Sequence, residues 1–271
     1  MTEPVPIRFS MCNEFCDGWD FHAACRLAAD TGYQGIELAP FTVGDSVEDI
    51  DARARAALAE TARRHGIEIV GLHWLLVKPE GLYINHPDDA IRARTADYLR
   101  AEIDFCADLG GKVMVVGSPK QRNVLPQDTY QAAWDRTVAA FKGLAPYAQQ
   151  RGVCLCIEAL GSSDTNFLST SAEARRLVEC VDHPGFRMML DVKAMCADVE
   201  PMPQIIHKCA PYLKHVHAND ENLGGPGSGD TDFRPVAQAL KDVGYDGYVS
   251  VEVFDFSPGP PRGSPPRACA T

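Results

Sequence analysis

Short apolar runs alternate with alanine-rich amphipathic stretches along almost all of the 271 residues. Apolar runs of about four to eight residues are typical of buried strands, and amphipathic stretches with a helical period are typical of surface helices. Their regular alternation predicts βα units and a parallel sheet. We expect eight strands, at residues 7–11, 35–39, 67–74, 112–116, 153–158, 186–191, 213–217 and 248–252.

One helix is expected after each of the first seven strands. The second of them has signals at both ends, since Ser46-x-x-Asp49 resembles a capping box and Gly66 suits the position just past a helix end. The expected helices cover residues 20–31, 47–65, 88–109, 128–150, 171–182, 203–210 and 233–241.

The spacing of the strands favours one closed barrel. Eight strands within 252 residues make about one strand in every 32 residues, with no linker between them, and a (β/α)₈ barrel takes about 250 residues. A doubly wound sheet is the alternative, but the segment after the first strand, SMCNEFCDGWD, lacks the glycine-rich phosphate turn of that fold. We therefore predict an α/β fold, a (β/α)₈ TIM barrel, as a single domain at 1–257.

The C-terminal segment departs from this plan. The last fifteen residues, SPGPPRGSPPRACAT, contain five prolines and are unsuited to a helix. We predict a proline-rich tail at 258–271, so that the eighth helix is missing or replaced. Apolar surface left uncovered beside the first and eighth strands favours a homo-oligomer, a two-fold dimer above all.

Charge and composition narrow the classes of partner. The chain has 26 Lys and Arg against 37 Asp and Glu, a net charge of −11, and no basic run, which argues against a nucleic-acid partner. It has no apolar stretch of membrane-spanning length and begins MTEPVPIRFS, without the features of a signal peptide. We expect a soluble cytoplasmic protein with no membrane partner, whose ten scattered cysteines are reduced.

Four potential metal ligands stand at the carboxyl ends of the last four expected strands, where barrel enzymes place their active sites. They are Glu158, Asp191, His217 and Glu252, separated by 33, 26 and 35 residues, about one βα unit each. Carboxylates buried at the ends of apolar strands need a common partner, and a divalent cation is the simplest one. Three carboxylates and one imidazole suit Mn²⁺, Co²⁺ or Mg²⁺ and leave two positions of an octahedral ion open.

Residues 7–256 resemble the sugar phosphate isomerase/epimerase superfamily, the xylose isomerase-like barrels that include the D-tagatose and L-ribulose 3-epimerases. The specific part of the resemblance is the Glu, Asp, His, Glu series, supported by the segments IEALGSSDTNFLST and HANDENLGGPGSGDTDF. The resemblance implies that the four residues bind Mn²⁺ or a similar ion. It also implies that Glu158 and Glu252 exchange the substrate proton as acid and base from opposite faces.

This resemblance implies a small keto-sugar or sugar phosphate as the substrate, epimerised or isomerised through an enediolate that the cation stabilises. Asp164 keeps the character of an acidic substrate contact. The usual substrate-binding His is replaced by Ala194, with Lys193 just before it, and the usual Arg by Leu223. Both replacements argue against a plain epimerase of free ketohexoses.

Other residues on the same rim are candidates for substrate contact. His73 and Glu37 end the third and second strands, and Trp74 is suited to an apolar wall. His215 lies one layer below His217 and is suited to support it.

The loop after the fourth strand, GSPKQRNV, is a further candidate. Its Ser118, Lys120 and Arg122 would suit a phosphate or carboxylate, or else form a solvated basic loop.

Three other functions stay open on this scaffold. A lyase, dehydratase or keto-glycoside deglycosidase begins with the same proton abstraction. A non-catalytic sugar-binding barrel is disfavoured because both candidate acid/base carboxylates are present. A DNA-repair enzyme of the endonuclease IV type, which resembles this chain in fold, needs more rim histidines and a positive surface.

Overall fold

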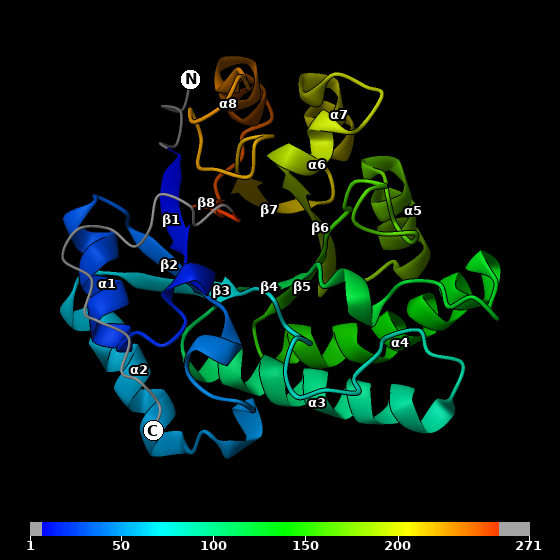
Figure 1. The fold of residues 1–271 in the computed structure, drawn as a ribbon, viewed down its shortest axis with the longest axis horizontal. Helices are drawn as coiled ribbons and strands as arrows, with labels where there is room; N and C mark the ends of the chain where they lie inside the picture. Colours follow the sequence, from blue (N-terminus) through cyan, green and yellow to red (C-terminus); the bar gives the residue numbers. More distant parts are fainter. Residues whose placement is uncertain (1–6, 255–271) are drawn as a thin grey trace.

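The computed structural model describes residues 7–254, in which eight parallel strands close into a barrel in the order β1 to β8 (Figure 1). β8 pairs with β1 through Arg8 and Tyr248 and the residues that follow each of them, which completes the ring. The predicted barrel and its eight strands are confirmed. The strands are β1 Arg8–Cys12, β2 Gly35–Leu38, β3 Glu68–Leu72, β4 Val113–Val116, β5 Cys154–Ile157, β6 Phe186–Asp191, β7 Leu213–Ala218 and β8 Tyr248–Val251.

The helices surround the strands on the outside of the barrel (Figure 1). Their buried faces pack against the outward-facing side chains of the strands in one continuous apolar core. Within the described residues no helix is long and apolar enough to cross a membrane. The α-helices are α1 Phe21–Asp30, α2 Ala52–Arg64, α3 Asp89–Asp108, α4 Tyr130–Gln150, α5 Ser171–Val181, α6 Val192–Cys196, α7 Met202–Cys209 and α8 Phe233–Asp242.

Two helices differ from the sequence prediction. The predicted helix at 47–65 is divided: Ser46 caps a short 3₁₀ turn, Val47–Asp49, and α2 begins only at Ala52, where Asp51 accepts a hydrogen bond from Ala54. The short helix α6 was not predicted. It follows β6 directly because Asp191 caps it, accepting a hydrogen bond from the backbone of Ala194.

The inside of the barrel changes character along its axis. Toward the amino ends of the strands it is filled by a small apolar cluster, and toward their carboxyl ends by buried polar side chains. Successive side chains on a strand face opposite sides, so positions two apart line the same interior face. The apolar cluster contains Val70, Val113, Val115, Cys154, Cys156, Met189 and Tyr248.

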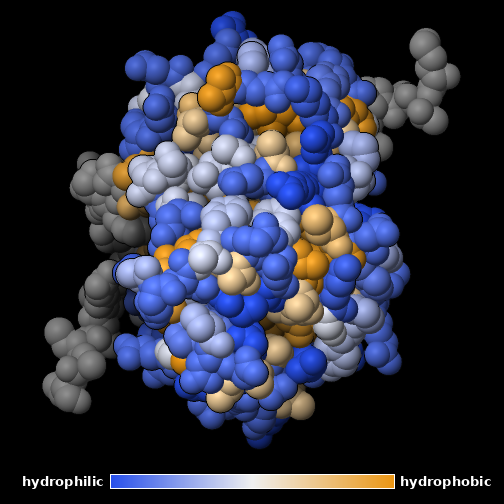
Figure 2. All heavy atoms as spheres, turned by 90° about the vertical axis from the view of Figure 1, so that its right-hand side faces the viewer, coloured by the Kyte–Doolittle hydropathy of each residue, from blue (hydrophilic) through white to orange (hydrophobic). Residues whose placement is uncertain are grey.

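The side of the molecule that carries α4 and α5 has a mostly hydrophilic surface with small hydrophobic areas (Figure 2).

All nine described cysteines are free, as the composition predicts. The predicted tail at 258–271, and with it the replaced eighth helix, lies outside the described residues.

Candidate metal centre

The four predicted ligands converge at the carboxyl end of the barrel. Glu158, Asp191, His217 and Glu252, which we call the acidic quartet, each offer a ligand atom within 4.8 Å of the other three. Each side chain is buried, with 1% to 6% of its residue surface exposed. Four neighbouring strands of one closed barrel thus direct three carboxylates and one imidazole at a common point.

Glu158 follows the last residue of β5 and fits against the end of β4. Its backbone nitrogen donates to the carbonyl of Val116 at 3.2 Å, and its carboxylate lies against Gly117. A Cβ on Gly117 would stand 1.7 Å from Oε2 of Glu158, so any other residue there would displace the carboxylate. Gly117 is a part of the site that sequence reasoning missed.

Asp191 is held by two neighbours. Its Oδ1 accepts from the backbone of Ala194 at 2.7 Å, and its Oδ2 accepts from the Asn219 amide at 2.6 Å. Asn219 in turn accepts from the backbone of Lys193 at 2.9 Å. The orientation of this carboxylate is therefore fixed from both sides, by the start of α6 and by the end of β7.

His217 is oriented through both of its ring nitrogens. Nδ1 lies 3.1 Å from Oε2 of Glu252, on the side of the quartet, and Nε2 lies 3.0 Å from Oε1 of Glu37. A proton on Nε2 shared with Glu37 leaves the Nδ1 lone pair available to a cation. The other oxygen of Glu37 meets His215 at 2.6 Å and the Ser250 hydroxyl at 2.5 Å.

These contacts place Glu37 below the rim. The side chain is fully buried, and both of its oxygens are occupied by groups of β7 and β8. This position differs from the rim position that the sequence predicted, because Glu37 ends a two-residue step deeper in the barrel than the quartet. His215 has the supporting place that the sequence predicted for it.

The electrostatics of the quartet show a shortage of positive charge. Burial, followed by the carboxylates of Glu252 and Asp191, raises the pKa of Glu158 to about 8, and burial with Glu252 raises the pKa of Asp191 to about 6. Burial also opposes ionisation of Glu252, but the charge and hydrogen bond of His217 hold its pKa below the ordinary value. A divalent ion would remove this repulsion, so the oxygen-rich donor set fits a hard cation.

His73 and Trp74, just after β3, lie beside the quartet. The Nε2 of His73 is 3.0 Å from Glu14, its Nδ1 is buried without a partner, and the ring lies edge-on to His217 with 6.1 Å between the ring centroids. The indole nitrogen of Trp74 donates to Oε1 of Glu252 at 2.9 Å, and the residue is 36% exposed. Trp74 therefore extends from the quartet to the surface, whereas His73 is buried beside His217.

The remaining predicted contacts are divided between the mouth and the interior. Asp164 and Lys193 form an ion pair of 2.9 Å at the surface, with side chains that are 36% and 25% exposed. Lys120 is exposed. Arg122 differs from its prediction: it is buried, and its guanidinium donates to the backbone carbonyls of Val116 and Glu158 at 3.2 and 2.6 Å. It fastens the ends of β4 and β5 together beneath Glu158.

Several further polar residues of the site were missed. Glu14 bonds His73, Cys12 lies 3.9 Å from Nε2 of His217, and the hydroxyls of Ser10 and Ser250 are hydrogen-bonded inside the barrel. A signal exists for Ser250 and for Asn219, because each stands two residues from a predicted ligand, Glu252 and His217 respectively. Stepping by two from each ligand would have found them.

Comparison with known proteins agrees with this geometry. Residues 25–268 match the family described as the xylose isomerase-like TIM barrel. The chain belongs to this family. It is 31% identical to a D-psicose 3-epimerase of Ruminiclostridium cellulolyticum over 45% of its own length and 41% of the relative's, so this match spans less than half of that protein.

Other matches extend over most of this family member. It is 23% identical to a fructoselysine 3-epimerase of Shigella flexneri over 88% of the chain and 87% of the relative. A crystal structure of D-psicose 3-epimerase in the presence of D-fructose has a TM-score of 0.81 at 22% identity and covers 92% of this chain and 85% of that one. The structural likeness establishes the shared fold.

Proposed function

We propose that the protein is a divalent-metal-dependent epimerase or isomerase of keto-sugars or their phosphates, with Mn²⁺ as the favoured ion and Co²⁺ or Mg²⁺ as alternatives. The observation that carries the proposal is the convergence of the acidic quartet, within 4.8 Å, at the end of the barrel where this fold places its active sites. The names of the relatives, which are 3-epimerases of psicose and fructoselysine, support a keto-sugar as the substrate class.

The quartet would act in two ways. Glu158, Asp191, His217 and Glu252 would hold the ion, which when bound supplies Lewis-acid stabilisation of the charge that develops beside a carbonyl as a proton leaves. Glu158 and Glu252 would move that proton. One carboxylate takes the proton from one face of the carbon and the other returns a proton to the opposite face, which inverts the centre. Return to the adjacent carbon would give isomerisation instead.

Surrounding residues would orient the substrate. Asp164 and Lys193 form a paired acceptor and donor at the mouth, suited to sugar hydroxyls. The exposed Lys120 would meet a phosphate or carboxylate of the substrate. His73, which precedes Trp74 in the chain, would contact the substrate beside Glu252. Ala194 and Leu223 offer no polar side chain, so we propose a substrate that differs from a free ketohexose.

Solvent deuterium exchange tests the proposal. The protein loaded with Mn²⁺ is incubated in D₂O with a panel of keto-sugars, free, phosphorylated and glycosidic, and the products are read by NMR. We expect deuterium at one carbon next to the carbonyl, together with an epimer or isomer, and no exchange in Glu158→Gln. Loss of water or of a leaving group would identify the lyase or deglycosidase alternative. A panel with no exchange and no product would refute the proposal.

A further inference from the structure

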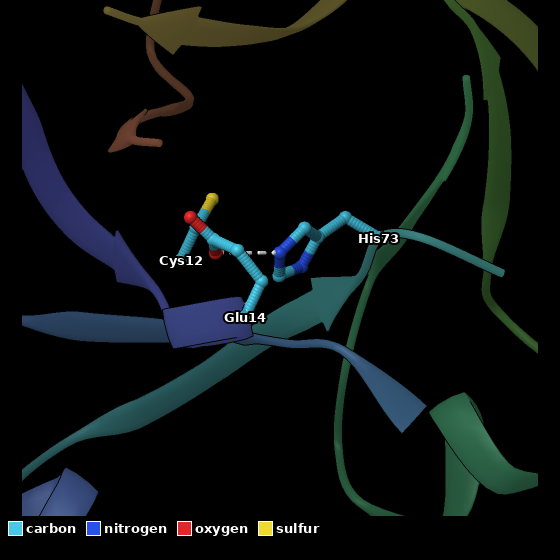
Figure 3. Close-up of side chains that lie close together, drawn as sticks. All are labelled: Cys12, Glu14 and His73. Carbon is cyan, nitrogen blue, oxygen red and sulfur yellow. Dashed lines mark hydrogen bonds and ion pairs between the residues drawn. The ribbon is translucent and has the colours of Figure 1, made fainter. Parts of the chain in front are cut away.

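A second group of potential ligands lies on the opposite side of the barrel from β5 and β6. Cys12 is the last residue of β1, Glu14 begins the 3₁₀ turn Glu14–Cys16 that follows, and His73 comes directly after β3. We call these three residues the thiol triad. Figure 3 shows the three side chains close together, with a dashed line between the carboxylate of Glu14 and the imidazole of His73.

The geometry of the triad is close to that of a metal site. One ligand atom from each residue lies within 4.8 Å of the other two. Ligand atoms around a tetrahedral zinc ion are separated by roughly 3.3 to 3.8 Å. The Glu14 and His73 atoms, 3.0 Å apart, would move slightly apart, and the other separations would close by at most about an ångström. The three residues are 0%, 6% and 1% exposed, which means that bulk water would not compete for the ion.

The carboxylate of Glu14 is already oriented for ligation. Its Oε1 accepts the backbone N–H of Val253 at 3.1 Å, and its Oε2 lies 3.0 Å from Nε2 of His73. An ion between Oε2, Nε2 and the Cys12 sulfur would replace the contact with His73 and leave the one with Val253 unchanged. Such an outer hydrogen bond to a ligating carboxylate is a regular feature of metal sites.

A divalent ion would leave the occupied triad without a net charge. The hydrogen bond with Glu14 raises the pKa of His73 against the effect of burial, and burial raises the pKa of Glu14 and of the Cys12 thiol. A thiolate, a carboxylate and a neutral imidazole would balance the two positive charges of the ion. Binding would release the protons held by the thiol and by the contact between Glu14 and His73.

Cys12 also lies near Glu37 and His217, a third group within ligand distance. That group is a poorer site, because Glu37 is already engaged by His215, His217 and Ser250. An ion there would break these bonds. The triad loses the contact between Glu14 and His73 and, in addition, only the 3.9 Å contact between the Cys12 sulfur and Nε2 of His217.

We propose that Cys12, Glu14 and His73 form a second divalent metal site, distinct from the acidic quartet, that takes Zn²⁺ or Co²⁺ in preference to Mn²⁺ and leaves a fourth position for water. The selectivity follows from ligand chemistry: thiolate and imidazole favour Zn²⁺ and Co²⁺, whereas carboxylates suit Mn²⁺ and Mg²⁺. The proposal concerns ion binding and does not depend on the reaction that the quartet performs.

Titration of the ion-free protein with Co²⁺ tests the site. A cobalt–thiolate bond gives a near-ultraviolet charge-transfer band, which oxygen and nitrogen ligands alone do not give. We expect two equivalents of Co²⁺ per chain and this band in the wild type. In Cys12→Ala we expect one equivalent and no band, and Cys16→Ala, a buried cysteine outside the triad, should match the wild type.

A second pair of variants separates the two sites. Glu158→Gln should weaken the equivalent bound by the quartet and keep the band, whereas His73→Gln and Glu14→Gln should weaken the band and keep the other equivalent. If near-ultraviolet circular dichroism shows that Cys12→Ala does not fold, His73→Gln and Glu14→Gln test the site in its place. A single equivalent in the wild type, or a band that persists in Cys12→Ala, would overturn the proposal.

Discussion

Buried carboxylates on the two sides of the barrel mouth differ in the number of imidazole partners that they have. On the side of β1 to β3, each carboxylate has an imidazole of its own: Glu14 meets His73, and Glu37 meets His215 and His217. On the side of β5 to β8, Glu158, Asp191 and Glu252 share the single imidazole of His217. The same kind of residue is charge-balanced on one side and short of positive charge on the other.

This difference in charge balance predicts which carboxylates need a cation. Glu37 gains enough from its two histidines that its pKa is held well below the ordinary value in spite of complete burial. Glu158 has no such partner, and its pKa is raised to about 8. Buried acidic residues by themselves therefore do not mark a site for a hard cation. The proposed cation site coincides with a cluster of unbalanced ones, and a balanced pair would accept an ion only by releasing protons, as proposed for the thiol triad.

The largest expected effect comes from removing the one imidazole of the acidic side. His217→Ala leaves three buried carboxylates facing one another, and we expect loss of most of the Mn²⁺ affinity. Isothermal titration calorimetry of the ion-free protein measures it, with exposed His207→Ala as the control. Affinity within a few-fold of the wild type would show that the quartet is not the Mn²⁺ site.

The next effect concerns the two carboxylates that are proposed to carry the proton. Glu158→Gln and Glu252→Gln should each lower turnover at least ~10²-fold, since general acid and base groups contribute about 10²- to 10⁴-fold. The fold should survive both changes. Turnover of the substrate found by deuterium exchange is compared with that of Glu221→Gln, an exposed carboxylate on the loop after β7. A near-normal rate in either variant would exclude its carboxylate as a proton carrier.

A smaller effect on Mn²⁺ affinity is expected from Glu37, which contacts His217 of the quartet from the other side of the barrel. Glu37→Gln keeps the size of the side chain but removes the charge that holds the proton on Nε2 of His217. Changes of such outer partners typically cost about 10- to 100-fold in metal affinity. We therefore expect Mn²⁺ affinity to fall by this factor, measured by the same calorimetry. An unchanged affinity would mean that Glu37 does not set the tautomer of His217.

The last prediction concerns stability and a buried carboxyl group that has neither an imidazole partner nor a place in the quartet. Glu102 on α3 is fully buried, both of its oxygens lack a partner, and burial raises its pKa well above 4.5. The folded state keeps a proton that the unfolded state releases, so stability falls as pH rises above about 4.5, by up to about 1.4 kcal/mol per pH unit until the folded pKa is reached.

Glu102→Met should therefore stabilise the protein, and more so at about pH 8 than at about pH 5. Urea unfolding at the two pH values measures the difference. Exposed Glu179→Met on α5 is the control. A stabilisation that is equal at both pH values would contradict a protonated Glu102.

The barrel and the convergence of the four residues of the quartet were predictable because each rests on a local signal. A strand of four to six residues shows as an apolar run, and the residue that ends it points into the mouth by the geometry of the fold. Boundaries that depend on one cap were harder to predict. Ser46 and Asp51 both act as caps, Ser46 for a short 3₁₀ turn and Asp51 for α2, and the sequence does not show which of the two starts the longer helix.

The depth of a side chain inside the barrel was not predictable from one strand alone. Glu37 and Glu158 both stand near the end of an apolar strand, yet β2 and β3 shift register between Ile36 and Glu37, and Glu37 ends below the rim. Arg122 shows the same limit. A basic residue in a polar loop predicts exposure, but two backbone carbonyls at the ends of β4 and β5 draw it inward.

The hydrogen-bonded layer under the quartet has a consequence for engineering. Ser10, Ser250, Glu37 and His215 occupy positions that apolar side chains would fill at less cost in desolvation, and replacing a whole buried polar network by apolar groups is often stabilising. A screen that ranks variants by melting temperature alone would favour such replacements. It would thereby enrich barrels that survive heat and have lost the support of His217, so a useful screen has to select for heat resistance and ion retention together.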